Sequence, residues 1–184
     1  MIPMKTSILT LLFLSLFYFT TTGQIAKSGY GPVFDKIGAT YTIENADLVP
    51  DSTAVLKAVF DIDYRSKDSL SSNPLISSLH RYLNMHVKNG VKESNISLAF
   101  VLHGASTKDA LTDEAYLKKY GIKNPNTDLI KTLAEHGVEM YICGQSAAYK
   151  GLSKAEMMPE IKLALSAMTV LTIYQAEGYA LIKF

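Results

Sequence analysis

The sequence predicts an α/β fold with three layers, in which helices cover both faces of a mainly parallel, five-stranded sheet. Nearly continuous apolar runs, typical of strands buried on both faces, alternate with segments whose apolar residues recur at helical spacing. This alternation, from a first strand to a last one, is the pattern of parallel strands joined by crossover helices. The 184-residue chain has one cysteine, so this core rather than a disulfide framework must stabilise it.

Residues 1–23 predict an export signal. Lys5 supplies a positive charge, and the apolar run Ile8–Phe19 that follows is too short to span a bilayer comfortably. Small residues then lead to a predicted cleavage between Gly23 and Gln24. We therefore expect a periplasmic or secreted protein with no membrane segment after cleavage; a retained N-terminal anchor is the alternative.

The rest of the chain is expected to form an N-terminal arm, residues 24–51, and one α/β domain, residues 52–184. The arm is rich in glycine and polar residues, and only Ala39–Ile43 has strand character. We expect the arm to lie over the domain and to contribute this segment as an edge strand. The formal net charge is +1 and the charges are interspersed, so no nucleic-acid partner is expected.

The domain begins with the predicted strand Val55–Ile62, which is almost entirely apolar. A helix then opens at Asn73, a favoured N-cap residue, with Pro74 at its first position. Gly90 is a natural end for this helix. The apolar run Ile96–Leu102 predicts the second strand.

The segment 105–124 is polar and is interpreted as an insertion with a short helix at Thr112–Tyr120. Asn126 is predicted to cap the helix that follows. The next apolar run, Val138–Ile142, predicts the third strand, and Cys143 comes directly after it.

Shorter elements complete the domain. Gly144–Gly151 predicts a tight turn and a short helix, and Ser153–Glu156 fits a capping box. A strand at Ile161–Leu165, a helix at Met168–Ala176 and a last strand at Tyr179–Lys183 follow. The residues expected in the core are Val59, Phe60, Leu79, Leu83, Phe100, Val101 and Ile142.

Cys143 is the candidate for chemistry. It lies between a strand and a helix, where open α/β sheets bind ligands, and a helix start favours the nucleophilic thiolate. A buried cysteine that acts as a small hydrophobe is the alternative. His103 ends the preceding strand and is expected at the same edge of the sheet. Its imidazole can accept the thiol proton there, or it can simply bond a loop backbone.

Other chemistries are less well supported by the residues. Gly104–Thr107 can cradle an anion at a strand end, but it lacks the glycine patterns of nucleotide sites. Ser146 lies outside a Gly-x-Ser-x-Gly elbow, so hydrolase chemistry is discounted. A single cysteine excludes a Cys-x-x-Cys redox pair and a cysteine-rich zinc site. A half-site of Cys143 and His103, completed across an oligomer interface, is a weaker alternative, and no cofactor is predicted.

Three segments in this order resemble the DsrE/DsrF-like family, in its exported, single-domain branch. They are Val101–Gly104 (VLHG) at a strand end, Gly137–Ser146 (GVEMYICGQS) across a strand and turn, and Gln175–Ala180 (QAEGYA) at a helix-to-strand corner. The resemblance extends over about Val55–Lys183. It implies a compact α/β fold with a parallel sheet and assembly into symmetric homo-oligomers, such as a trimer or a hexamer.

The resemblance also implies a chemistry. In the sulfur-handling members, a cysteine at the strand-to-helix position carries sulfur as a persulfide and passes it between protein partners, and Cys143 matches that position. His103, Gln175 and Gly178 match motif positions without an assigned role. This chain departs from the family by its predicted export signal, since the known sulfur relays work in the cytoplasm, and by the polar segment after His103. Both departures put the relay partners in question.

The leading hypothesis is therefore thiol-based sulfur handling, with a sulfur-donor or sulfur-acceptor protein as the expected partner besides the homo-oligomer. Cys143 would be the nucleophile and carrier, and His103 would tune or deprotonate it. The alternative is a non-catalytic small-ligand-binding or assembly module of the same fold. The residues expected to bind the ligand are Gly104, Gly144, Gln145, Ser146 and Gln175.

Overall fold

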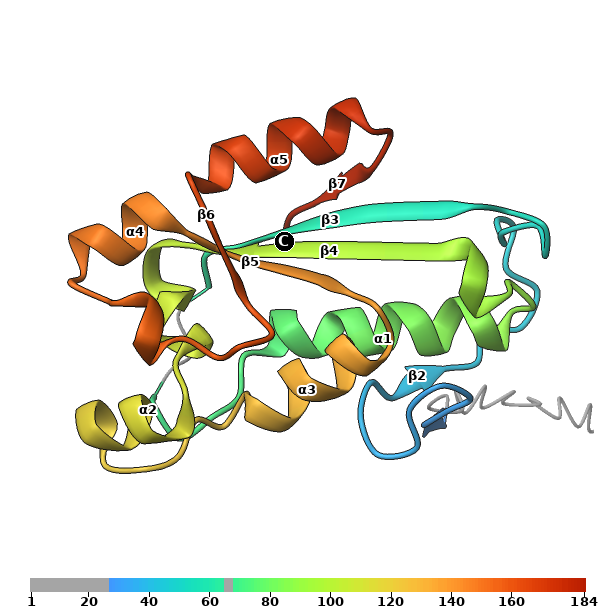
Figure 1. The fold of residues 1–184 in the computed structure, drawn as a ribbon. Coiled ribbons are helices and arrows are strands. Elements are labelled where there is room, and N and C mark those ends of the chain that lie inside the picture. The colour runs from blue at the N-terminus through green and yellow to red at the C-terminus, as the bar shows by residue number, and fades with distance from the viewer. Residues whose placement is uncertain (1–26, 65–67) are drawn as a thin grey trace, which may run out of the picture.

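The computed structural model describes residues 27–64 and 68–184, so the predicted export signal at 1–23 and its cleavage point lie outside the described residues. The centre of the molecule is a five-stranded sheet in the order β6-β5-β4-β3-β7, with every neighbouring pair parallel (Figure 1). Its strands are β3 Leu56–Ile62, β4 Ile96–Leu102, β5 Glu139–Cys143, β6 Lys162–Ala164 and β7 Ala180–Ile182. The predicted parallel sheet is confirmed.

Helices cover both faces of this sheet, which confirms the three-layer prediction. Figure 1 shows α1 (Pro74–Lys88) and α3 (Thr127–Glu135) on one face and α5 (Ala167–Ala176) on the other. The remaining helical elements are η1 Glu93–Asn95, η2 Gly104–Ala110, α2 Asp113–Tyr120, α4 Gly144–Tyr149 and η3 Lys154–Glu156. None of the helices within the described ranges combines the length and hydropathy that a membrane span requires.

The two faces of the sheet bury separate apolar clusters. The side that faces α1 and α3 contains Phe60, Phe100 and Ile142, and the side that faces α5 contains Val59 and Val101. Alternate residues of one strand point to opposite faces, so the continuous apolar runs supply both clusters. All seven predicted core residues are buried: Val59, Phe60, Leu79, Leu83, Phe100, Val101 and Ile142.

The N-terminal arm is attached to α1 rather than to the main sheet. The predicted strand segment of the arm is found as β2 (Thr40–Tyr41), but it pairs with β1 (Ser28–Gly29) in a separate antiparallel sheet and adds no edge to the main sheet. The edges of the main sheet are β6 and β7. The buried side chain of Asn84 in α1 holds the arm through backbone groups of Val33, Phe34, Ile37 and Gly38.

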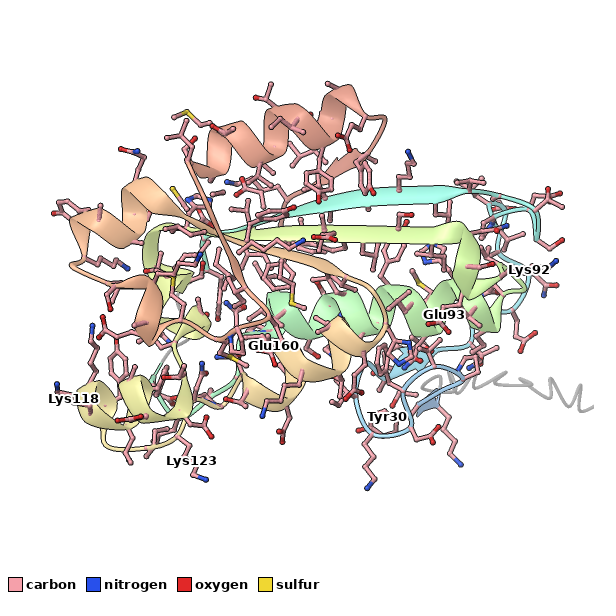
Figure 2. All side chains as sticks on the ribbon, in the orientation of Figure 1. Tyr30, Lys92, Glu93, Lys118, Lys123 and Glu160 are labelled. Carbon is pink, nitrogen blue, oxygen red and sulfur yellow. The ribbon has the colours of Figure 1, made fainter. Side chains whose placement is uncertain are left out.

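The segment 105–124 is an integrated part of the fold and not a loose polar insertion. It contains most of η2 and all of α2, and Leu111 and Tyr116 are fully buried in a small cluster of their own. On its outer side, Lys118 and Lys123 project from the molecule (Figure 2). Because charged and apolar residues alternate in this stretch, the sequence did not indicate that one side of it is buried.

A buried polar network joins this segment to the starts of α1 and α3. The carboxylate of Asp109, fully buried, accepts hydrogen bonds from Asn73 Nδ2 at 2.8 Å, Lys108 Nζ at 2.9 Å and Asn126 Nδ2 at 3.2 Å. Asn73 caps α1 as predicted, by accepting from the Leu75 N–H. Asn126 stands at the start of α3 but its side chain makes no capping bond. The predicted position of the cap is confirmed, but the capping bond does not form because Asn126 Oδ1 accepts from the Asn73 N–H at 2.6 Å instead.

Candidate functional site

The candidate site lies where β5 passes into α4. Cys143 is the last residue of β5 and the N-cap of α4, and its strand partner is Ala164 of β6. The next residue must be glycine, because a Cβ atom on Gly144 would lie 2.5 Å from the carbonyl oxygen of Ala164. This close approach lets the chain turn from strand to helix directly under β6. The predicted turn and short helix after the cysteine are confirmed.

The Cys143 side chain lines a cavity of about 260 Å³ at the carboxyl end of the sheet. Cys143 itself is only 5% exposed, so the sulfur is set into the wall of the cavity rather than projecting from it. The start of α5 forms the opposite wall. The lining consists of Asp61, His103, Cys143, Gln145, Ser166, Ala167, Met168 and Leu171. Cys143 and His103 therefore lie at the same edge of the sheet, as predicted.

The surroundings of the thiol favour its ionised form. Burial alone raises the pKa of the Cys143 thiol. Hydrogen bonds from the Ser146 hydroxyl and from the backbone N–H groups of Ser146, Ala167 and Gln145 outweigh burial and bring this pKa below the ordinary value of a cysteine. The donors come from the first turns of both α4 and α5, so two helix starts meet at one sulfur atom.

His103 is held by a carboxylate and not by the thiol. Its Nε2 lies 2.6 Å from Oδ1 of Asp61, whose other oxygen accepts from Lys183 Nζ at 2.7 Å. Burial raises the pKa of the Asp61 carboxyl, but the hydrogen bonds from Lys183 and His103 prevail and hold this pKa below its usual range. An ionised carboxylate only accepts, so His103 must carry a proton on Nε2. The imidazole is thereby oriented beside the cavity.

The other predicted site residues divide into two groups. Ser146 Oγ accepts from the Gly104 N–H at 3.2 Å, and the same hydroxyl lowers the pKa of the Cys143 thiol, so Gly104 supports the site through Ser146. Gln145 lines the cavity, and its side chain donates to the Leu165 carbonyl. Gln175 does not line the cavity. Its side-chain amide donates to the Leu171 carbonyl one turn earlier in α5 and is exposed.

Sequence reasoning missed Asp61 and Lys183. Asp61 was visible as the one carboxylate in the apolar run at the end of β3, a position that requires a partner in the folded state. Lys183 follows the last strand, and its partner is 122 positions away in the sequence. No local spacing signals such a pair, because the β3–β7 pairing brings the two together.

A metal centre finds no support in the described residues. Within 27–64 and 68–184, no three histidine, cysteine, aspartate or glutamate side chains are grouped so that they could hold an ion. His80 is fully buried, and its Nε2 bonds Thr132 Oγ1 at 2.9 Å, whereas His136 bonds Glu93 at 2.6 Å. His80 therefore serves packing in the core, and His136 serves a surface contact with Glu93.

The fold and the site together define a three-layer α/β protein with a cysteine at the carboxyl edge of its parallel sheet. Residues 70–184 match the model of the DsrE/DsrF-like family, and the chain belongs to this family. Two solved structures share the fold, each with 16% sequence identity and with 70% of this chain and 99% of the other covered. They are the protein of unknown function MTH1491 from Methanobacterium thermoautotrophicum, with a TM-score of 0.52, and the ychN protein from E. coli, with a TM-score of 0.51. No curated protein matches the chain.

We expect the Ser146→Ala variant to ionise its thiol at higher pH than the parent protein. The hydroxyl of Ser146 is the largest of the contributions that lower the pKa of Cys143, and alanine removes it while leaving the backbone N–H groups. The pH profile of alkylation by iodoacetamide measures this pKa, and the curve should move to higher pH. An unchanged profile would show that the hydroxyl does not bond the sulfur.

Proposed function

We propose that the protein is a thiol-based sulfur carrier that holds sulfane sulfur as a persulfide on Cys143. The observation that carries the proposal is a thiol of lowered pKa in the wall of an open cavity, next to the His103–Asp61 pair. The thiolate is the nucleophilic form of cysteine, so an environment that stabilises it raises the fraction able to react. Membership of the DsrE/DsrF-like family supports a sulfur-related role.

The transfer needs no oxidant beyond the sulfur donor itself. The Cys143 thiolate attacks the terminal sulfur of a polysulfide such as HS–S–SH, and a new S–S bond forms as the donor's own S–S bond breaks. The products are Cys143–S–SH and the anion HS–S⁻, so atoms and charge balance. His103 faces the same cavity, and Asp61 holds its ring in place beside the reacting sulfur atoms.

The cavity favours a small, uncharged or weakly charged sulfur group. It measures about 260 Å³, and its wall on α5 is formed by Ala167, Met168 and Leu171. Thioether and aliphatic groups are suitable neighbours for polarisable sulfur. The Asp61 carboxylate disfavours multiply charged anions there. A short polysulfide, or the persulfide side chain of a partner protein, meets these conditions.

Mass spectrometry of the folded protein after anaerobic polysulfide treatment tests the proposal. The parent protein should gain the mass of one or more sulfur atoms on the peptide that contains Cys143, and a thiol reductant should remove it. The Cys143→Ser variant is the matched control and should gain nothing. A folded parent protein that takes up no sulfur while its unfolded form does would end the proposal.

We also propose that the carrier works outside the cytoplasm, after removal of residues 1–23. The support is the charged start, the short apolar run and the small residues of this segment. N-terminal sequencing of the protein recovered from the producing cell should give Gln24 as the first residue. An intact Met1 would contradict export by a cleaved signal.

A second candidate function, an assembly module, is favoured by one observation. The first turn of α5 and the segment before it expose large apolar side chains: Leu165 is 72% exposed and Met168 is 75% exposed. Such a face suits contact with other copies of the chain. Light scattering should therefore give a homo-oligomer. If the Cys143→Ser variant keeps both the oligomer and the physiological function, the assembly module is the better description.

A further inference from the structure

His80 is a buried ionisable residue that the proposed sulfur chemistry does not use. It belongs to α1, and its side chain is fully buried. The ring of Phe34 in the arm lies 4.6 Å from the His80 ring, centroid to centroid, and Thr132 Oγ1 of α3 lies 2.9 Å from His80 Nε2. A Cβ atom on Gly38 would lie 2.6 Å from the His80 carbonyl carbon, so the arm also contacts the backbone of α1 here. The imidazole is therefore enclosed by the arm and two helices.

The arm lies next to α1 and is held there by few contacts (Figure 1). Phe34 is the only apolar side chain that is buried within residues 27–51. The backbone N–H groups of Val33 and Phe34 donate to Asn84 Oδ1 at 3.0 Å and 2.8 Å, one helical turn after His80. The neighbouring helix α3, by contrast, buries three apolar side chains: Leu129, Ile130 and Leu133. Detaching the arm exposes less apolar surface than detaching α3, so the arm is the first of the two to open.

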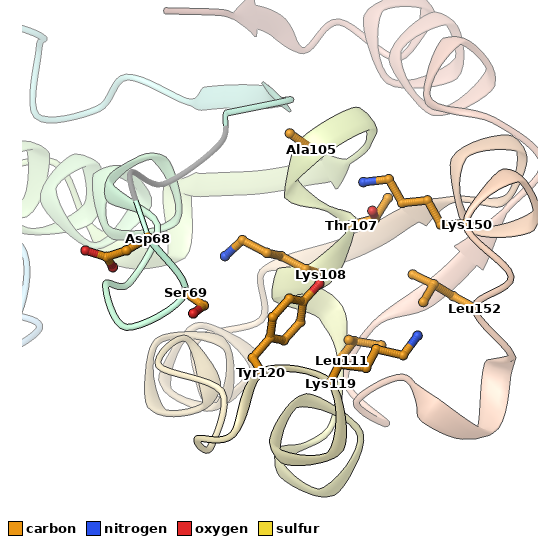
Figure 3. Close-up of a pocket in the computed structure, with 10 residues that line it drawn as sticks. All are labelled: Asp68, Ser69, Ala105, Thr107, Lys108, Leu111, Lys119, Tyr120, Lys150 and Leu152. Carbon is orange, nitrogen blue, oxygen red and sulfur yellow. The ribbon is translucent and has the colours of Figure 1, made fainter.

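Two partly buried lysines show how charged groups elsewhere in the molecule are compensated. Lys108 and Lys119 line a cavity of about 400 Å³ beside η2 (Figure 3). Lys108 Nζ bonds the buried carboxylate of Asp109 at 2.9 Å, and Lys119 Nζ lies 3.5 Å from Glu156 Oε1. His80 has no such partner, because none of the ion pairs among the described residues includes it. A proton on His80 would therefore create a buried charge without a counterion.

The charged groups around His80 do not favour a proton on its ring. His136, at the end of α3, also packs against Phe34, with ring centroids 4.6 Å apart. A charge on His136 disfavours one on His80, and the carboxylate of Glu93 bonds His136. The other charged side chains next to these contacts in the arm, α1 and α3 are exposed: Asp35, Lys36, Arg81, Asp128, Lys131 and Glu135. In the part of the chain that the structure describes, no carboxylate is thus placed to stabilise a protonated His80.

The attachment of the arm is therefore linked to pH. Burial lowers the pKa of His80 from 6.5 to about 4; the carbonyl groups of Ile76 and Leu129 oppose this shift, and a charge on His136 adds to it. Once the arm is detached, the imidazole is in water and regains its ordinary pKa. The detached state then binds the proton more readily than the attached state. Attachment is complete above about pH 6.5 and weakens as the pH falls toward about 4.

We propose that protonation of His80 detaches the arm from α1 in mildly acidic surroundings, while the central sheet stays folded. The device is the enclosure of an imidazole without a counterion beneath the segment 33–38 of the arm. Detachment uncovers His80 and Asn84 on α1 and frees Phe34 from between two imidazole rings. This inference is independent of the sulfur-carrier proposal.

Hydrogen–deuterium exchange of the folded protein, followed by NMR from about pH 7 to about pH 4, tests the inference. The amides of Val33 and Phe34 report on the arm, because both bond Asn84. Their protection, corrected for the intrinsic exchange rate, should fall about tenfold for each pH unit below about 6.5, since detachment takes up one proton. The amides of the buried strand β4 should stay far better protected than the arm at every pH.

The variant His80→Gln removes the titrating group, so the protection of Val33 and Phe34 should no longer depend on pH in this range. His86→Gln is the matched control on the same helix. The ring of His86 bonds the Tyr82 carbonyl and not the segment 33–38, so this variant should keep the parental pH dependence.

Three results would overturn the inference: protection of the arm that does not change with pH, equal protection of the arm and β4, or a parental pH dependence in His80→Gln. If His80→Gln does not fold, an NMR titration of the His80 ring in the parent protein decides. The ring signals should shift well below pH 6.5, and a shift centred at the ordinary value of 6.5 would show that the arm does not enclose the imidazole.

Discussion

Replacing Asp109 by alanine is expected to lower the free energy of unfolding by about 3–5 kcal/mol, which is the usual cost of leaving a buried charge without its partner. Lys108 would lose its counterion while its side chain is only 14% exposed. The amides of Asn73 and Asn126 would lose their acceptor in the same step. These asparagines are the N-cap residues of α1 and α3. The substitution would therefore weaken the packing of both helices on one face of the sheet.

Urea unfolding measures this loss, and Asp35→Ala is the matched control. Asp35 is an exposed aspartate in the arm, so its replacement should change the free energy of unfolding by less than about 0.5 kcal/mol. A loss of no more than about 1 kcal/mol for Asp109→Ala would be typical of an exposed polar group and would contradict the network. Asp109→Asn keeps an acceptor oxygen and should lie between the parent protein and Asp109→Ala.

Replacing Gly144 by alanine is expected to destabilise the protein by about 1–3 kcal/mol, as overpacking of a filled site does. The new methyl group would lie 2.5 Å from the Ala164 carbonyl oxygen and 3.2 Å from that of Leu165. Both neighbours are backbone atoms, so relief requires β6 to move away from β5. This movement would also shift the start of α5, and the Ala167 N–H that helps to stabilise the thiolate would move with it.

Two measurements follow from this geometry. The urea midpoint of Gly144→Ala should fall, and the pH profile of Cys143 alkylation should move to higher pH because a donor to the thiolate is lost. Gly29→Ala is the control, since a Cβ atom there meets nothing within 4 Å and the backbone conformation suits any residue. If the Gly144→Ala variant has the urea midpoint of the parent protein and the same pH profile of Cys143 alkylation, the turn can accommodate a Cβ atom and the prediction is wrong.

The strands of the sheet were predictable because parallel strands are buried on both faces and leave continuous apolar runs. Ile96–Leu102 has the predicted bounds, and the predicted strand Val55–Ile62 differs by one residue. Helix starts were predictable where a cap has a local signature, as at Asn73 and Pro74. These features depend on near neighbours in the chain, which the sequence displays directly.

Features that depend on distant partners were not predictable. The arm attaches through Asn84, a polar residue that fits any helix surface until its partners about fifty positions away are known. Asn126 is the N-cap residue of α3 as its signal indicates, but its side-chain oxygen accepts from the distant Asn73 N–H instead of from α3. The partner of His103 was missed for the same reason, since Asp61 lies 42 positions earlier in a neighbouring strand.

The position of the candidate site followed from topology, whereas its chemical detail did not. Consecutive parallel strands β4 and β5 are neighbours, so His103 and Cys143 meet at one edge as expected. The main donors to the sulfur, however, include the Ala167 N–H from α5, which no spacing near Cys143 indicates. Gln175 was expected to bind the ligand, yet its side chain bonds its own helix and does not line the cavity.

The rate of alkylation of Cys143 as a function of pH, compared between the folded protein and the protein unfolded in urea, tests the central claim most directly. Hydrogen bonds from two helix starts lower the pKa of the folded thiol, and the cavity gives a reagent access to it. The folded protein should therefore react along a curve displaced to lower pH than the unfolded one. If the folded thiol stays inert until the chain unfolds, or ionises at higher pH than in urea, the proposed sulfur carrier has no reactive centre.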